Sequence, residues 1–132
     1  MAASDTGENK RPTDAELAIL QVLWDAGPNT VRGVYRQLNE SRKTGYTTVL
    51  KLMQIMTDKG LVVRDLSVRP QVYRAVRSQG HTQRQLVGHL VERAFSGSPG
   101  NLVLQALSTK KASAEERRQI RELLDRLERE AR

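Results

Sequence analysis

The sequence predicts a mainly α-helical protein that carries one small β-hairpin. Of its 132 residues, 38% are hydrophobic but only 4% are aromatic, a composition more typical of helix bundles than of β-sandwiches. Apolar residues recur at spacings of three and four over most of the chain, which is the period of a helix packed on one side. Residues 61–76 differ, because two β-rich segments there flank Ser67-Val68-Arg69-Pro70 and indicate a hairpin.

The first helix follows a polar N-terminal tail. Residues 1–11 are polar and have no apolar period, so we expect a disordered tail there. Thr13 and Glu16 then have the spacing of a capping box, in which each side chain accepts a hydrogen bond from the other's backbone N–H. A helix is predicted over residues 14–25, up to a glycine-proline pair. Within it, Trp24 is expected to anchor the core.

Two further helices and the hairpin complete the first domain. Thr30 is a favoured N-cap residue, and the helix that it opens is expected to end near Asn39. A polar connector leads into a helix over residues 45–59, which closes at Gly60, the residue favoured just past a helix end. Three helices followed by a hairpin over 61–76 make up a winged helix-turn-helix.

The rest of the chain predicts a second, all-helical part. The helical period returns at Thr82 and is broken at Gly97-Ser98-Pro99-Gly100, which has the composition of a turn. A short helix is expected over residues 101–108. Ser113 and Glu116 form a second capping box, which opens a terminal helix.

We therefore divide the chain into a winged-helix domain, residues 12–78, and a helical dimerisation domain, residues 79–132. The apolar faces of the second domain can pack onto the first domain or against a second copy. We favour a homodimer, because two-fold symmetry gives a DNA-binding protein both affinity and site length. The residues expected to form the dimer interface are Leu86, Leu90, Phe95, Leu104, Leu107, Ile120, Leu124 and Leu127.

Positive charge is concentrated in the winged-helix domain. The net charge of the chain is +7, and residues 32–77 contain ten basic residues against three acidic ones. Such a segment favours a polyanionic partner, since each neutralised phosphate releases counterions. A membrane is the competing polyanion, but a membrane-surface helix needs a large apolar face opposite its basic one. Here the basic residues are spread over helices, loop and strands, so we favour double-stranded DNA. The ten are Arg32, Arg36, Arg42, Lys43, Lys51, Lys59, Arg64, Arg69, Arg74 and Arg77.

The helix over residues 45–59 has a free polar face at its N-terminal end. Threonine hydroxyls on this face are short enough to approach base edges, and a lysine there can reach a phosphate. An ordinary amphipathic surface helix is the alternative interpretation. Tyr46 lies near the apolar arc, so it contacts either a base or the core. The residues expected to bind DNA are Arg32, Lys43, Thr44, Tyr46, Thr47, Thr48, Lys51 and Arg69, with Arg32, Lys43 and Lys51 on phosphates and Arg69 at the flank of the site.

Catalytic and metal-binding patterns are absent from the sequence. There is no cysteine, and the two histidines, His81 and His89, have no partner at metal-ligand spacing. No phosphate loop, nucleophile elbow or nucleotide fingerprint is present. We therefore expect no enzyme activity, no metal and no cofactor. The sequence also has no apolar run of about 18 residues and no signal peptide, so we expect a cytoplasmic protein without membrane insertion.

Several segments together resemble the penicillinase-repressor (BlaI/MecI/CopY) family of bacterial transcriptional regulators, from about Thr13 to the C-terminal helix. The resemblance implies a homodimeric repressor whose winged helices bind a palindromic operator and whose C-terminal helices join the two protomers. It also implies a β-lactamase operon, or a related resistance or stress operon, as the target. The segments that carry it are Thr13-x-x-Glu16-x-x-Ile19-Leu20-x-x-Leu23-Trp24, Tyr46-Thr47-Thr48-Val49, Lys59-Gly60-Leu61-Val62-x-Arg64 and Tyr73-x-Ala75.

The resemblance further implies a route of inactivation. In the family, a membrane-bound sensor metallopeptidase triggers cleavage in the dimerisation domain, at an Asn-Phe bond in the best-known members. This chain has Gln105-Ala106 at that place, so these residues are the possible cleavage site although the bond differs. The copper-responsive branch carries a cysteine-rich motif that this chain lacks, which argues against copper as the signal. The alternatives are a winged-helix regulator that a small-molecule ligand releases from DNA, and an interaction module that does not bind DNA.

Overall fold

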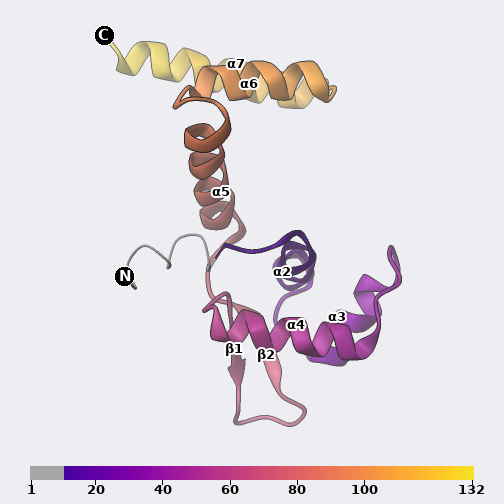
Figure 1. Cartoon of the computed structure of the whole chain (residues 1–132). Coiled ribbons are helices and arrows are strands. Elements are labelled where there is room, and N and C mark those ends of the chain that lie inside the picture. Colours follow the sequence, from indigo (N-terminus) through magenta and orange to yellow (C-terminus); the bar gives the residue numbers. More distant parts are fainter. Residues whose placement is uncertain (1–10) are drawn as a thin grey trace. The chain divides into compact units, whose positions relative to one another are not determined.

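The structure, a computed structural model, describes residues 11–132 (Figure 1). Apart from Arg11, the tail expected over residues 1–11 lies outside the described residues. The chain divides into two compact units, Met1–Leu86 and Val87–Arg132. The described residues form α-helices and a single two-stranded antiparallel sheet, which confirms the predicted fold class.

From residue 11 on, the first unit begins with three helices, and the predicted caps start two of them. They are α2 (Asp14–Ala26), α3 (Val31–Leu38) and α4 (Tyr46–Asp58). Thr13 Oγ1 accepts a hydrogen bond from the Glu16 N–H at 3.2 Å, and Glu16 Oε1 accepts one from the Thr13 N–H at 2.9 Å, so the predicted capping box is present. Thr30 Oγ1 accepts from the Gly33 N–H at 3.0 Å and caps α3.

Helix α4 ends where the sequence predicts. Gly60 has φ +77°, a backbone conformation that costs a residue with a Cβ about 1 kcal/mol or more. The turn allows the Leu61 N–H to donate to the Met56 carbonyl at 2.9 Å, which satisfies a carbonyl at the helix end. The glycine therefore directs the chain out of α4 and straight into the hairpin.

The hairpin consists of β1 (Val62–Asp65) and β2 (Val72–Ala75), paired with Val62 opposite Ala75. It extends away from the three helices in Figure 1. Asn29, just before α3, adds a one-residue bridge to the free edge of β2. Its N–H donates to the Tyr73 carbonyl at 2.9 Å, and the Tyr73 N–H donates back at 2.7 Å. This bridge joins the start of α3 to the hairpin.

A single core holds these elements together, and α4 contributes three completely buried side chains to it. The predicted apolar arc of α4 therefore faces the core. Burying one such aliphatic side chain contributes about 1.5 to 3 kcal/mol. The buried apolar side chains of this core are Ile19, Leu20, Leu23, Val31, Val34, Leu38, Val49, Met53, Met56, Val62 and Tyr73.

Trp24 has a different role from the expected core anchor. It is only half-buried and packs at the side of the core. Its Nε1–H donates to the Arg77 carbonyl at 3.0 Å. The indole therefore joins the end of α2 to the segment that follows the hairpin, as a polar contact as well as an apolar one.

Three helices follow the hairpin: α5 (Gln79–Ala94), α6 (Pro99–Thr109) and α7 (Ala114–Glu130). Two of them begin before the predicted residue. At α5, Ser78 Oγ accepts from the His81 N–H at 3.1 Å, so the helix starts at Gln79. At α6, Ser98 Oγ accepts from the Asn101 N–H at 3.0 Å. Proline is compatible with the first helical position, so half of the predicted turn belongs to α6.

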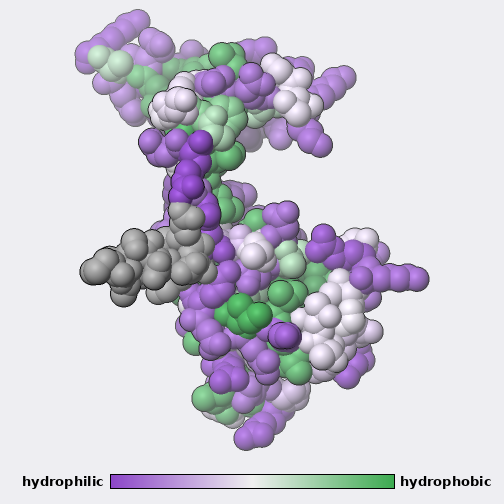
Figure 2. Space-filling view, viewed as in Figure 1, coloured by the Kyte–Doolittle hydropathy of each residue, from purple (hydrophilic) through white to green (hydrophobic). Residues whose placement is uncertain are grey.

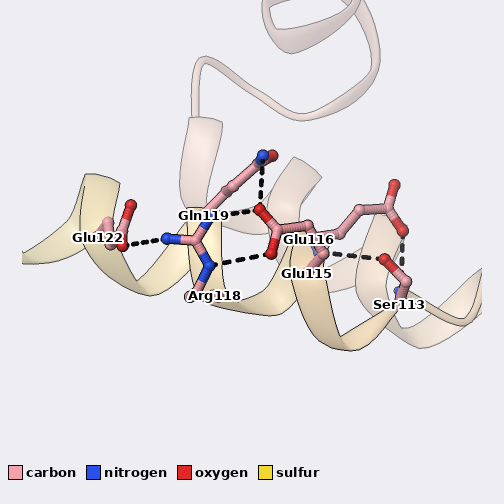
Figure 3. Close-up of polar contacts among 6 residues, drawn as sticks. All are labelled: Ser113, Glu115, Glu116, Arg118, Gln119 and Glu122. Carbon is pink, nitrogen blue, oxygen red and sulfur yellow. Dashed lines mark hydrogen bonds and ion pairs between the residues drawn. The ribbon is translucent and has the colours of Figure 1, made fainter.

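Helix α7 begins with the second predicted capping box. Ser113 Oγ accepts from the Glu116 N–H at 3.1 Å, and Glu116 Oε1 accepts from the Ser113 N–H at 2.8 Å (Figure 3). On the next turn, the guanidinium of Arg118 pairs with both Glu115 and Glu122. These pairs are exposed to solvent, so they contribute little to stability.

Candidate nucleic-acid interface

The N-terminal half of α4 presents a polar face that the core holds outward. Thr47, Thr48 and Lys51 are exposed, whereas Val49 and Met53 on the other side of α4 have no exposed surface. Rotation of the helix about its axis would bring the two apolar side chains into water, at a cost of about 1.5 to 3 kcal/mol each. The threonines and the lysine are therefore fixed toward solvent.

Thr44 lies before α4 and not on its face. Its N–H donates to Asn39 Oδ1 at 3.3 Å, and its carbonyl accepts from Asn39 Nδ2 at 2.9 Å. Asn39 also donates to the Tyr35 carbonyl, so one side chain organises the turn between α3 and α4. Thr44 is half-buried within this turn, and Lys43 beside it is exposed.

Tyr46, the first residue of α4, contacts one aromatic and one cationic side chain, Tyr35 and Arg32. Its ring meets that of Tyr35 edge-on, with centroids 5.6 Å apart and an interplanar angle of 78°. The guanidinium carbon of Arg32 lies 4.8 Å from the centroid of the Tyr46 ring, which is within cation–π distance. Tyr46 also packs against the core.

Beside Tyr46 lies an open groove of about 660 Å³ between the start of α3 and the hairpin. Its lining includes three arginines: Arg32 and Arg36 from α3, and Arg69 from the hairpin loop. Arg36 was not among the predicted DNA-binding residues. Its position four residues after Arg32 places both on one side of a helix, and this spacing was the available signal.

The hairpin loop that carries Arg69 is shaped by Asp65. Asp65 Oδ1 accepts from the Ser67 hydroxyl at 2.6 Å and from the Ser67 N–H at 2.9 Å. These two bonds, the hydroxyl bond first, lower the pKa of Asp65 below its usual value. The Asp65 carboxylate therefore stays charged, and its hydrogen bonds are made within the loop.

Lys59 does not belong to the candidate DNA interface, although it is one of the ten basic residues between 32 and 77. Its Nζ lies 2.6 Å from Glu16 Oε1 and donates to the Arg11 carbonyl at 2.9 Å. Lys59 added to the count of basic residues in this segment, but its charge is paired inside the fold. Its position just after α4 gave no sign of this pairing.

The residues predicted to form the dimer interface lie on α5, α6 and α7, except Phe95, which directly follows α5. Neither α6 nor α7 has a buried residue, and hydrophobic side chains reach the surface over this unit (Figure 2). Leu86, Phe95 and Ile120 are half-buried. The other five are exposed by the following fractions: Leu90 47%, Leu104 67%, Leu107 43%, Leu124 55% and Leu127 49%.

The possible cleavage residues are exposed within a helix. Gln105 and Ala106 lie near the middle of α6, and the Gln105 carbonyl accepts a bond from Thr109 Oγ1 at 2.6 Å. Within residues 11–132 there is no cluster of three or more histidines and carboxylates suited to a metal ion. Within the same range, no helix combines the length and the apolar character needed to cross a membrane.

Comparison with known proteins gives a consistent result. The model of a family described as "Penicillinase repressor" matches residues 12–126. Two curated relatives, both named transcriptional regulator BlaI, come from Mycobacterium tuberculosis strains CDC 1551 / Oshkosh and ATCC 25618 / H37Rv. Each is 33% identical over 84 residues, which cover 63% of this chain and 58% of the relative. The match therefore spans somewhat more than half of the length of these relatives.

Proposed function

The chain belongs to the penicillinase repressor family, and we propose on this basis that it is a transcriptional repressor that binds duplex DNA as a homodimer. The family consists of DNA-binding regulators and not of enzymes. The observation that carries the proposal is the exposure of Thr47, Thr48 and Lys51 on a helix whose opposite side holds Val49, Met53 and Met56 completely buried in the core. A helix held in this way can enter the major groove without disturbing its own core.

The proposed binding mode assigns separate tasks to the polar residues. Thr47 and Thr48 on α4, with Thr44 in the turn before it, approach base edges. Lys51 holds a phosphate of the strand beside α4. The start of α4 assists, because the N-cap residue Gly45 offers no side chain to the helix N-terminus, whose dipole favours anions. The remaining phosphate contacts are assigned to Arg32 and Lys43, and Arg69 contacts the flank of the site.

The proposed dimer uses the C-terminal helices. Five of the predicted interface leucines are at least 43% exposed in the single chain, and burying such side chains against a second copy is favourable by about 25 cal/mol for each Å² removed from water. A two-fold symmetric dimer would recognise a palindromic operator. We propose that the protein acts in the cytoplasm and represses a resistance or stress operon.

Relief of repression is proposed to follow cleavage between Gln105 and Ala106, triggered by a membrane-bound sensor metallopeptidase. Both residues are exposed, but α6 has to open locally before an extended segment can enter a protease. Cleavage there would separate the end of α6 and all of α7 from the DNA-binding unit. Intact-mass measurement after induction in the native host tests this step, because release by a small molecule would leave the chain mass unchanged.

DNA binding itself is tested by a salt titration. The purified protein is titrated with a duplex taken from upstream of its own gene and with a random duplex of equal length. We expect binding to both, tighter to the first, with the logarithm of affinity falling linearly with the logarithm of salt concentration. Absence of any salt-dependent affinity would assign the chain to the interaction modules. Footprinting on the same upstream DNA would then locate the operator.

A further inference from the structure

The groove beside Tyr46, here called the arginine groove because Arg32, Arg36 and Arg69 line it, differs from an ordinary basic surface. It is formed by three segments far apart in sequence, which are the start of α3, the first residue of α4 and the end of the hairpin loop. Among the residues that the structure describes as its lining, three are arginines and none is acidic. The polar lining residues Thr30 and Gln71 add hydrogen-bonding groups.

One of the three arginines, Arg32, is held in place by an aromatic ring. The guanidinium of Arg32 lies over the Tyr46 ring at 4.8 Å, and the edge-on contact with Tyr35 supports that ring from the other helix. Exposed arginines ordinarily lose much side-chain freedom when they bind a phosphate. An arginine already resting on a ring has less freedom to lose, so its phosphate contact costs less.

From this geometry we infer that the groove is a clamp for one phosphodiester strand, in which Arg32, Arg36 and Arg69 hold the backbone and Tyr46 is a positioning residue for Arg32. Tyr46 then does not read a base. The inference rests on the proposed DNA binding and deepens it, because it assigns Arg36 to the interface and gives Tyr46 a role that is independent of operator sequence.

The residues next to the groove indicate which kind of molecule binds in it. Thr47 and Thr48, the next two residues of α4, are exposed. A strand whose bases meet these threonines carries its phosphates past the start of α4, where Tyr46 and Arg32 lie. A free phosphorylated ligand has the same chemistry, and the experiment separates the two sources.

The test measures binding of random duplex and upstream duplex by fluorescence anisotropy at several salt concentrations. We expect Tyr46→Phe to bind both within twofold of the wild type, because the ring is kept. Tyr46→Leu should weaken both by the same factor, about two- to fivefold, the range of an exposed cation–π contact. Arg36→Ala should also weaken both and lower the salt slope by about one. In an Arg32→Ala background, Tyr46→Leu should cause no further loss.

Several results would overturn the inference. Loss of preference for the upstream duplex in Tyr46→Phe, with unchanged affinity for random DNA, would make the tyrosine a base reader. Additive losses in the double variant would separate Tyr46 from Arg32. Displacement of random duplex by inorganic phosphate at constant ionic strength would assign the groove to a small ligand. Thermal unfolding of each variant shows whether it is folded. If the wild type binds no DNA, the proposed function is wrong. If the wild type binds DNA normally but the variants do not behave as expected, only the inferred phosphate clamp is wrong.

Discussion

Lys59 Nζ lies 2.6 Å from Glu16 Oε1 and joins the end of α4 to the first turn of α2. The side chain of Glu16 is 3% exposed and that of Lys59 is 17% exposed, so the pair is largely removed from water. The same Oε1 accepts the Thr13 N–H of the capping box. One carboxylate oxygen therefore both caps α2 and fixes the far end of the helix proposed to contact DNA.

Replacing Lys59 with methionine should destabilise the fold without weakening the electrostatic attraction to DNA. Lys59→Met leaves Glu16 buried and unpaired, at a cost of about 3 kcal/mol. Adding Glu16→Gln should recover part of the loss, because glutamine can still close the capping box. Urea unfolding measures the stability, and the salt slope of DNA binding should stay at the wild-type value. A reduced salt slope would show that Lys59 contacts DNA after all.

Thr48 and Lys51 should affect DNA binding in different ways. Thr48→Val keeps the shape but removes the hydroxyl, so affinity for the upstream duplex should fall by about 1 to 3 kcal/mol while affinity for random DNA stays constant. Lys51→Ala should weaken both duplexes equally and reduce the salt slope by about one. A mobility-shift titration measures both variants. Our placement of the recognition helix would be wrong if neither variant changed binding.

Gly33 should be intolerant of alanine for a reason that lies outside its own helix. A Cβ at this position would come 1.9 Å from Asn29 Oδ1, the atom that accepts the Thr30 N–H at 2.8 Å. Gly33→Ala should therefore lower the free energy of unfolding by about 1 kcal/mol, the value of the displaced hydrogen bond.

The matched test for Gly33 is a double-mutant cycle. In an Asn29→Ala background the obstacle is gone, and Gly33→Ala should then stabilise α3 by up to about 1 kcal/mol through helix propensity. This change of sign, followed by thermal unfolding, distinguishes a steric conflict from a general need for glycine. Destabilisation in both backgrounds would refute the explanation.

Charge placed on the exposed leucines should separate the proposed dimer. Leu104 and Leu124 are 67% and 55% exposed in the single chain, so Leu104→Lys with Leu124→Lys should leave the winged-helix unit folded. An apolar interface that has to bury two lysines is strongly disfavoured. We expect monomers by sedimentation velocity at concentrations where the wild type is dimeric. Gln105→Lys, on the same helix, is the control for added charge, and a double variant that stayed dimeric would exclude these faces.

The second capping box should be sensitive to acid. Hydrogen bonds from Ser113, first its N–H and then its hydroxyl, lower the pKa of Glu116 below the ordinary value of 4.5. Because the folded pKa is the lower one, the contribution of Glu116 to stability is complete above pH 4.5 and is lost as the pH falls through the lowered value. Ser113→Ala should raise the pKa of Glu116, as measured by NMR titration, whereas Ser108→Ala should not. An ordinary pKa for Glu116 in the wild type would contradict the capping geometry.

Much of the local structure was predictable because its causes are local. The capping boxes at Thr13 and Ser113 need only residues three positions apart, and Gly60 ends α4 through its own backbone conformation. The starts of α5 and α6 were predicted too late, since Ser78 and Ser98 act as caps ahead of the first apolar residue. Periodicity locates apolar faces better than it locates helix ends.

The sequence by itself determined the fold class and the exposed polar face of α4, because helical period and capping depend on near neighbours in the chain. Tertiary structure alone decided which charges remain available, since Lys59 meets Glu16 across 43 positions of the chain and Arg32 meets Tyr46 from another helix. Such pairs form only after the apolar faces have packed and brought distant side chains within a few ångströms. Charge composition therefore indicated a polyanionic partner, whereas packing decided which charged side chains remain exposed.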